Sequence, residues 1–158
     1  MRPRIYDEGN LIATAKRFAK ELREHFEGEG ELESYERDIA KALAFTDFDG
    51  YRIAKSLDQI GYEVDAGVVE IFDNAFSVAR EENRKRIKQW VIDSGIHPTF
   101  EVGALVKASD MGKIVDGEIV RIDAAQAEYV VFCESLGHVR SGSGTRGIYV
   151  PFEKVVGR

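Results

Sequence analysis

Apolar residues recur every three or four positions through the first part of the chain, a spacing that predicts amphipathic helices. The first helix is expected to begin near Asp7–Asn10, where a short polar side chain can accept hydrogen bonds from the unpaired amides of the first turn, and to end at the glycine-rich residues 28–31. Two further helices are predicted around 32–45 and 50–60. The buried face of the first helix is predicted to consist of Leu11, Ala15, Phe18, Leu22 and Phe26.

A fourth and longer helix is predicted over residues 66–93, with Asp65 as its cap. Apolar positions follow one another at intervals of three and four along one face of this segment. At 1.5 Å per residue, the helix would be roughly 40 Å long. A helix of this length must pack on several partners or project outward, so its apolar face is a candidate seam for a homodimer. That face consists of Val69, Phe72, Phe76, Ala79, Asn83, Ile87 and Trp90.

The pattern changes near Gly95 and Pro98, which interrupt the helical spacing. Beyond Pro98 the apolar residues come in short β-branched runs that alternate with polar positions, as is typical of β-strands. Four or five strands are expected, and Gly117 is expected to mark a bulge or a sharp bend in the second run. The chain is therefore predicted to be an α+β protein, with a helical bundle of about four helices over 1–97 and a β domain over 98–158.

Three short motifs occur in the β region. They are Val-Gly-Ala-Leu-Val at 102–106, Gly-Glu-Ile-Val within 117–122, and Val-Pro-Phe-Glu-Lys-Val at 150–155. Together with the hydrophobic meander between them, they make residues 99–158 resemble an SH3-like small barrel. The resemblance implies a curled antiparallel sheet. Because such barrels bind proteins, RNA and DNA alike, it implies an architecture and not a function.

Composition and charge exclude several classes of partner and location for this protein. The chain of 158 residues has 22 Lys and Arg against 28 Asp and Glu, a net charge of −6. An acidic chain has no general attraction to polyphosphate, so any binding of nucleic acid would have to be local. No apolar run is long enough for a secretory signal or a membrane span, so no membrane partner is expected. Cys133 is the only cysteine, which precludes an intrachain disulfide and favours a cytoplasmic location.

Residues 142–147 read Gly-Ser-Gly-Thr-Arg-Gly, a literal G-x-G-x-x-G. A dinucleotide-binding loop of this type needs a helix directly after it and an acidic residue about 20 positions further on. Here only eleven residues follow Gly147, and they include a proline and several β-branched residues, which predict a strand. We therefore predict a hairpin loop that displays Arg140 and Arg146.

The sequence "AFTDFDGYR" at 44–52 resembles the D-x-D-G motif of haloacid-dehalogenase-like phosphatases. The resemblance implies Asp47 as nucleophile and Asp49 as its acid. In this chain Tyr51 takes the place of the threonine that follows the glycine in that family, and helical periodicity precedes the aspartates. The favoured interpretation is that Asp47 or Asp49 caps the third helix.

Cysteine and histidine positions give no catalytic or metal-binding pattern. Cys133 lies in an alternating strand sequence, which predicts a buried apolar cysteine rather than a thiolate activated by His138. His25, His97 and His138 are isolated in the sequence and lack metal-ligand spacing. The protein is therefore expected to be non-enzymatic, with no catalytic residue, no cofactor and no bound metal.

The sequence "REENRKRIK" near the end of the long helix carries five basic residues against two acidic ones. Three of the basic residues are spaced at four, so they share a helix face that could follow a phosphate backbone. The favoured alternative is a solvated face in which Glu81 pairs with Lys85. The three residues of the basic face are Arg80, Arg84 and Lys88.

Two functions from different classes follow. The first is a non-enzymatic protein-interaction or regulatory protein that binds an unidentified protein target, as phage or plasmid accessory and inhibitory factors do. An amphipathic long helix and a barrel loop are both common recognition surfaces. The alternative is a local nucleic-acid-binding protein. Its contact residues would be Arg80, Arg84, Lys88, Lys113, Arg140 and Arg146.

Overall fold

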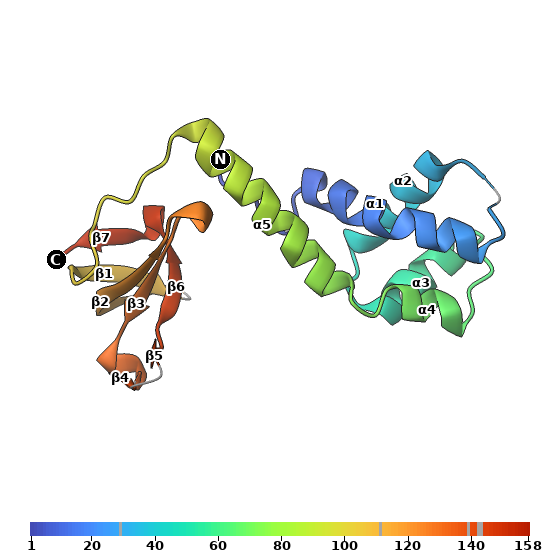
Figure 1. The fold of residues 1–158 in the computed structure, drawn as a ribbon. Helices are drawn as coiled ribbons and strands as arrows, with labels where there is room; N and C mark the ends of the chain where they lie inside the picture. Colours follow the sequence, from blue (N-terminus) through green and yellow to red (C-terminus); the bar gives the residue numbers. More distant parts are fainter. Residues whose placement is uncertain (29, 111, 139, 142–143) are drawn as a thin grey trace. The chain divides into compact units, whose positions relative to one another are not determined.

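A computed structural model describes residues 1–28, 30–110, 112–138, 140–141 and 144–158. Helices come first along the chain and an antiparallel sheet follows, which confirms the predicted α+β class (Figure 1). The chain forms two compact units, Met1–Arg86 and Ile87–Arg158. The boundary between them lies inside α5 (Ala75–Ser94). The two-domain division at residues 97 and 98 stays a prediction.

The first unit is helical. It contains α1 (Glu8–His25), α2 (Leu32–Leu43), α3 (Gly50–Asp58), α4 (Ala66–Ile71) and the beginning of α5. The first three helices agree with their predicted positions to within two residues at each end. None of the helices in the described residues combines the length and the apolar character needed to cross a bilayer.

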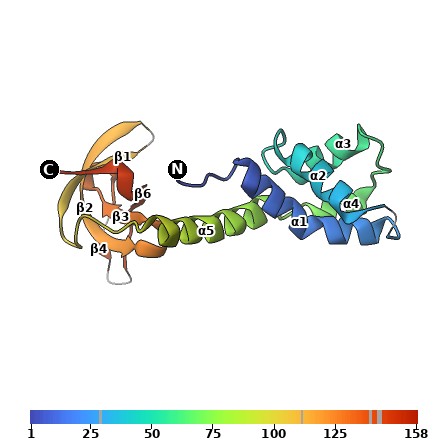
Figure 2. The same ribbon diagram turned by 90° about the horizontal axis from the view of Figure 1, so that it is seen from above.

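The core of the first unit is formed by the inward faces of all these helices. On α1 the predicted stripe is confirmed, because Ala15, Phe18 and Leu22 are buried. The helices α1 and α2 make the most extensive helix–helix contact (Figures 1 and 2). The side chain of Asn10 ties α1 to α5, since its Nδ2 donates to the carbonyl of Ala79 at 3.1 Å. Other large buried side chains are Ile39, Leu43, Ile53, Leu57 and Phe72.

The single helix predicted over 66–93 is wrong, because the chain breaks between α4 and α5. Phe72 ends α4 with φ −98° and ψ 2°, and α5 begins at Ala75. The residues between them are Asp73 and Asn74, whose short polar side chains compete with the backbone for hydrogen bonds and so disfavour helix interiors. The break redirects the chain so that Phe72 is fully buried, with its ring centroid 5.1 Å from that of Phe18.

The second unit contains a curved antiparallel sheet of five strands, as predicted (Figure 2). Its strands in spatial order are β6 (Ile148–Pro151), β3 (Glu128–Phe132), β2 (Lys113–Asp123), β1 (Leu105–Asp110) and β7 (Val155–Gly157). Within the described residues β6 and β7 do not pair with each other, so the sheet is not closed. A separate two-stranded pair is formed by β4 (Arg140–Ser141) and β5 (Gly144–Thr145).

The core of the second unit lies on one face of this sheet. Tyr129 is fully buried and its ring stacks at 4.4 Å from that of Phe152. Its hydroxyl accepts hydrogen bonds from the amides of Thr99 and Phe100, at 2.8 and 3.0 Å. Trp90, near the end of α5, packs against the same core. A single tyrosine thereby fastens the segment that precedes β1 to the sheet.

Gly117 does not interrupt β2, contrary to the expected bulge or bend at this position. The strand runs through it, and the register shift lies further along, between Ile119 and Arg121. A Cβ atom at Gly117 would lie 2.5 Å from Cγ1 of Val131 and 2.6 Å from the carbonyl oxygen of Phe132. Glycine is therefore required here by the close approach of β3.

Candidate functional site

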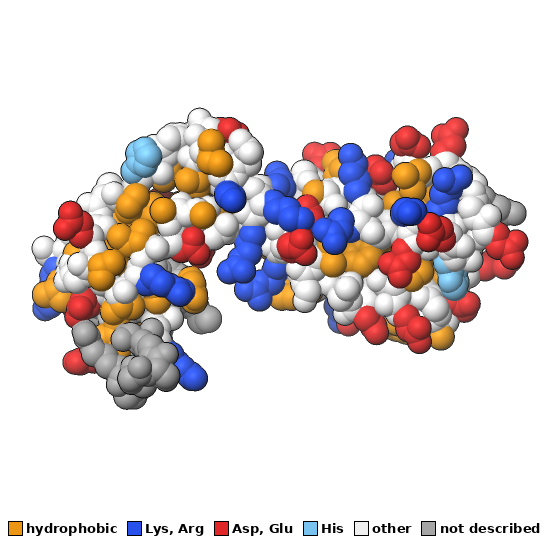
Figure 3. Space-filling view, in the orientation of Figure 1, with side chains coloured by type: hydrophobic (Ala, Val, Ile, Leu, Met, Phe, Trp, Pro, Cys, Tyr) orange, Lys and Arg blue, Asp and Glu red, His pale blue; other side chains and the backbone are white. Residues whose placement is uncertain are grey.

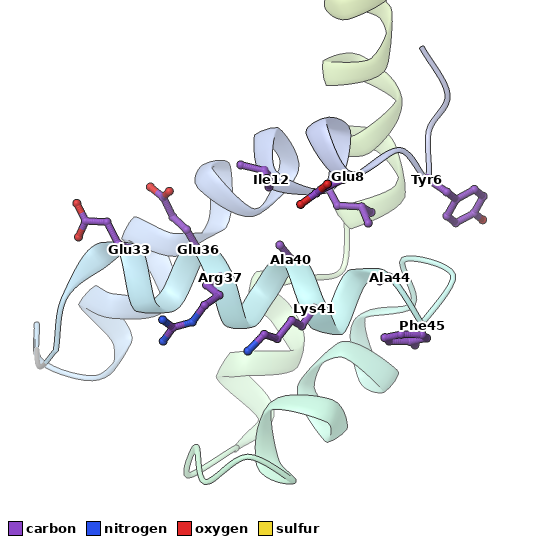
Figure 4. A pocket seen from close by; sticks show the side chains of 11 residues that line it. Tyr6, Glu8, Ile12, Glu33, Glu36, Arg37, Ala40, Lys41, Ala44 and Phe45 are labelled. Carbon is purple, nitrogen blue, oxygen red and sulfur yellow. The ribbon is translucent and has the colours of Figure 1, made fainter. Parts of the chain in front are cut away.

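A groove of about 600 Å³ opens between the first turn of α1 and the outer face of α2 (Figure 4). Its lining follows from helical spacing, because residues three and four apart share one face of a helix. The first two turns of α1 contribute Leu11 and Ile12, and the last turn of α2 and its C-cap contribute Ala40 and Ala44. Small alanine side chains on α2 leave the space between the helices unfilled. The groove therefore has an apolar floor along both helices.

Two aromatic residues stand at one end of the groove. Tyr6 directly precedes α1 and Phe45 directly follows α2, and Figure 4 shows both rings at the same end of the helix pair. The side chain of Phe45 is 88% exposed and that of Tyr6 is 52% exposed. Exposed aromatic rings beside an apolar concavity are typical of anchor residues in protein interfaces.

A strained turn follows Phe45. Asp47 and Phe48 have φ of 51° and 60°, and the amide of Asp49 donates to the carbonyl of Thr46 at 2.9 Å. Two consecutive left-handed residues cost energy when neither is glycine. The turn places Phe48 in the core, with its ring centroid 5.2 Å from that of Tyr6. Burial of Phe48 offsets the strain, whereas Phe45, in the turn that ends α2, lies in solvent.

Charged side chains line the two rims of the groove. Figure 4 shows Glu33 and Glu36 on the side of α2 nearer α1, whereas Arg37 and Lys41 lie on the opposite side. Glu8, in the first turn of α1, also borders the groove. Among the described residues, the three glutamates have no cationic partner. One rim is therefore acidic and without internal compensation.

The basic rim is partly neutralised by a single carboxylate, which both of its cations share. Asp38 Oδ1 lies 3.6 Å from Nε of Arg37 and 3.7 Å from Nζ of Lys41. Its other oxygen, Oδ2, accepts a hydrogen bond from the hydroxyl of Tyr62 at 3.1 Å. Burial raises the pKa of Tyr62 well above its usual value, and the charge of Asp38 raises it further. The cations of this rim are held by Asp38, while the acidic rim faces solvent.

The basic face predicted on α5 is present as a row of residues along one helix. Arg80, Arg84 and Lys88 are exposed, and the guanidinium of Arg80 lies 5.8 Å from the ring centroid of Phe76. Lys and Arg side chains gather along α5, whereas Asp and Glu side chains predominate over α1 to α4 (Figure 3). The predicted pair Glu81–Lys85 is confirmed, with 2.8 Å between Oε1 and Nζ.

The hydrogen bond to Lys85 lowers the pKa of Glu81, and hydrogen bonds to Glu81 and Glu82 raise the pKa of Lys85. Glu82 also pairs with Arg17 of α1, at 3.0 Å. The two carboxylates of this segment are thus both engaged by cations.

The other three predicted contact residues come from the second unit. Lys113 begins β2 and is exposed, and Arg146 follows β5 and is exposed. The backbone of Arg140 begins β4, but its side chain lies outside the described part of the chain. Each of these residues belongs to a different element, so they do not form a row as the α5 residues do.

The aspartates of the D-x-D-G sequence have structural roles. Asp49 is the N-cap of α3, and its Oδ1 accepts from the amide of Arg52 at 2.8 Å. Asp47 lies 3.7 Å from the guanidinium of Arg52. A helix, α2, precedes them where the phosphatase motif would need a strand. The predicted capping role is confirmed for Asp49.

Cys133 and His138 meet through the backbone and not through the thiol. The amide of Cys133 donates to Nδ1 of His138 at 3.1 Å, while Sγ is buried and lies 3.9 Å from the carbonyl oxygen of Val131. This burial was predicted from the alternating pattern. Within the described ranges, no three His, Cys, Asp or Glu side chains are grouped as metal ligands would be.

Residues 142 and 143 of the G-x-G-x-x-G sequence lie outside the described residues, and the strands on either side of them, β4 and β5, pair with each other as in the predicted hairpin. Arg140 pairs with Thr145 and Ser141 with Gly144, and the next element is strand β6. A Cβ at Gly147 would lie 2.6 Å from the carbonyl oxygen of Val131. The last glycine of the motif thus permits contact between the backbone and β3.

Sequence reasoning missed the α1–α2 groove. Ile12 and Phe45 lie outside the apolar stripes that define the buried faces of their helices, and this mismatch was the available signal. The first turn of α1 lies beside the last turns of α2 only in the folded chain, and the spacing of apolar residues does not predict this proximity.

Comparison of the chain with models of protein families finds no family model that matches. Comparisons with curated proteins and with solved structures likewise find no match. The proposals for what the groove binds therefore rest on its own residues.

Proposed function

We propose that this chain is a non-enzymatic protein-interaction or regulatory protein that binds a protein partner through the α1–α2 groove. The observation that carries the proposal is the position of Phe45, which is 88% exposed at the end of an apolar groove. Covering such a ring together with the apolar groove beside it would remove apolar surface from water, which favours binding.

Two features of the site support a role in recognition. The turn that follows Phe45 contains two residues with positive φ, Asp47 and Phe48, and backbone strain of this kind is concentrated at functional sites. The groove also combines an apolar floor with a charged rim, which is the usual anatomy of a protein interface.

Affinity capture with matched variants tests this proposal. The wild-type chain, a Phe45→Ala variant and a control variant Phe76→Ala, which removes another exposed ring, are immobilised and incubated with nuclease-treated lysate of the source cells. Quantitative mass spectrometry should find a protein that the wild type and Phe76→Ala retain and Phe45→Ala loses. Identical sets of captured proteins for all three chains would contradict the proposal.

The alternative function is local binding of nucleic acid through the row Arg80, Arg84 and Lys88 on α5, with Lys113, Arg140 and Arg146 as further contacts. It is favoured by the exposure of all three of these side chains on α5. The affinity for duplex and single-stranded nucleic acid should fall steeply between two salt concentrations. No binding even in dilute salt removes this alternative.

The second unit is proposed to be an SH3-like barrel. In support, β1, β2, β3 and β6 form an antiparallel meander, and a 3-10 turn over Phe152–Lys154 leads into β7, which pairs with the other edge of β1. A homodimer through α5, a cytoplasmic location and a phage or plasmid origin belong to the same hypothesis. Light scattering that shows a strict monomer at high concentration would contradict the dimer.

A further inference from the structure

We infer that the occupant of the α1–α2 groove is a basic amphipathic α-helix of a partner protein. This inference rests on the proposed function, because it names the kind of partner that the same groove would bind. Three properties of the groove support it. The floor has no hydrogen-bonding side chains for a bound backbone, the acidic rim has no cationic partner among the described residues, and the aromatic ring of Phe45 lies at one end.

The floor favours a helical occupant. The groove floor consists of Leu11, Ile12, Ala40 and Ala44, whose side chains neither donate nor accept hydrogen bonds. The first unit also has no strand in its described residues, so it offers no sheet edge to an extended peptide. A backbone that is buried without hydrogen-bond partners is strongly disfavoured. A helix satisfies its own backbone and can present apolar side chains at i, i+3 or i+4, and i+7 to such a floor.

The length of the groove agrees with a helix of about three turns. Its lining on α2 runs from Glu33 to Ala44, which at 1.5 Å per residue spans about 16 Å. Phe45 stands at one end of this span and would contact the last apolar turn of the bound helix. The position of Phe45 therefore determines which end of the groove the last apolar residue of the bound helix occupies.

The rim favours a basic occupant. Glu8, Glu33 and Glu36 have no cationic partner among the described residues, whereas the cations Arg37 and Lys41 both contact Asp38. A helix with Lys or Arg beside its apolar stripe would place cations opposite the three glutamates. Complementary charge of this kind selects partners and accelerates association. An acidic helix would meet uncompensated like charge and be rejected.

Three synthetic peptides serve as probes of the full-length chain. Each is a fluorescein-labelled peptide of about 18 residues, long enough for measurable helicity. The first has Leu at helical spacing with Lys and Ala elsewhere. The second replaces every Lys with Glu, and the third keeps Lys but carries a central Pro, which breaks the helix. Fluorescence anisotropy gives the affinity of each peptide, and amide chemical-shift changes show where it binds.

The Lys peptide should bind, and the Glu and Pro peptides should bind at least about tenfold more weakly, the difference that about 1.4 kcal/mol makes in an equilibrium constant. The double variant Glu33→Lys/Glu36→Lys should weaken the Lys peptide by a similar factor. Glu8 and Glu33 each lie in the first turn of a helix, where a carboxylate is stabilising, so circular dichroism first verifies that the double variant keeps the helix content of the wild type. The matched control is Glu21→Lys/Glu63→Lys, which makes the same charge change at exposed positions outside the groove and should leave the affinity within about twofold.

The outcomes separate this inference from the proposed function. If the Glu or Pro peptide binds as tightly as the Lys peptide, and that binding requires Phe45, the groove binds proteins but its occupant is not a basic helix. Equal loss of affinity in both double variants would show general attraction to an acidic chain and would overturn the inference. Binding of the Lys peptide that is unaffected by Phe45→Ala, with shift changes away from the groove, would contradict both.

Discussion

Phe45 and Phe48 lie three residues apart in one loop, yet their side chains are 88% and 4% exposed. The left-handed turn at Asp47 and Phe48 places the Phe48 ring in the core against Tyr6. Phe45 precedes this turn, in the turn that ends α2, and its ring lies in solvent beside the α1–α2 groove.

Alanine at these two positions should therefore have opposite effects. Phe48→Ala removes a buried ring and should lower the free energy of unfolding by about 3–5 kcal/mol. Phe45→Ala removes an exposed ring and should change it by less than about 0.5 kcal/mol. Denaturant unfolding followed by circular dichroism measures both. A large loss of stability in Phe45→Ala would mean that this ring supports the core and is not available to contact a partner.

The backbone of Asp47 provides a second test. Its φ of 51° is tolerated by aspartate, costs nothing sterically for glycine, and is poorly tolerated by a β-branched residue. Asp47→Val should lower the free energy of unfolding by about 1–3 kcal/mol, whereas Asp47→Gly should leave it unchanged within about 1 kcal/mol. Asp47 is exposed, so lost packing cannot account for the difference. Equal stabilities of the two variants would argue that the turn is not strained.

Gly147 should resist replacement because β3 passes close to it. A Cβ there would lie 2.6 Å from the carbonyl oxygen of Val131, a backbone atom that cannot move without disturbing the sheet. Gly147→Ala should cost about 1–3 kcal/mol of stability. At Gly67 the close atoms, His25 Cε1 at 2.7 Å and Asp65 Oδ1 at 3.2 Å, belong to side chains and not to the backbone, so Gly67→Ala should cost less than Gly147→Ala. Thermal unfolding of both variants, followed by circular dichroism, gives the comparison.

Asp65 should make stability depend on pH in the acid range. Its Oδ1 accepts from the amide of Val68 at 3.1 Å, and this hydrogen bond lowers its pKa below the usual value, with a further contribution from His25. A carboxyl whose pKa is lower in the folded state stabilises the fold above its unfolded pKa, and that contribution is lost as pH falls through the folded pKa. The loss is therefore expected on acidification below about pH 4.

Asp65→Asn isolates this contribution, because asparagine also caps helices but does not titrate. Unfolding free energies of the wild type and the variant should converge as the pH is lowered through the acid range. A constant difference between them at all pH values would contradict the role assigned to the Asp65 carboxylate.

Much of the fold follows from local sequence. The apolar spacing of α1 to α3, the caps Asp49 and Asp65, and the strand after Gly147 each depend on residues within a few positions of one another. Such features are encoded by side-chain periodicity and by backbone preferences, and the structure agrees with them.

The helix break at Asp73 and Asn74 was not predicted from the local spacing of apolar residues. One apolar face continues through these residues in sequence, so periodicity favoured an unbroken helix. The gain from burying Phe72 against Phe18 depends on contacts between distant parts of the chain, and it decided the outcome. The register shift between Ile119 and Arg121 is similar, because it is defined by the partner strand.

By itself, then, the sequence determined the kind and order of the elements, because these depend on short-range spacing, capping and chain stiffness. Only the tertiary structure decided that the start of α1 lies beside the end of α2, that Phe48 is buried while Phe45 is not, and that the acidic rim lacks internal partners. These properties arise from packing between residues far apart in the chain, and no local pattern specifies which surfaces that packing leaves open.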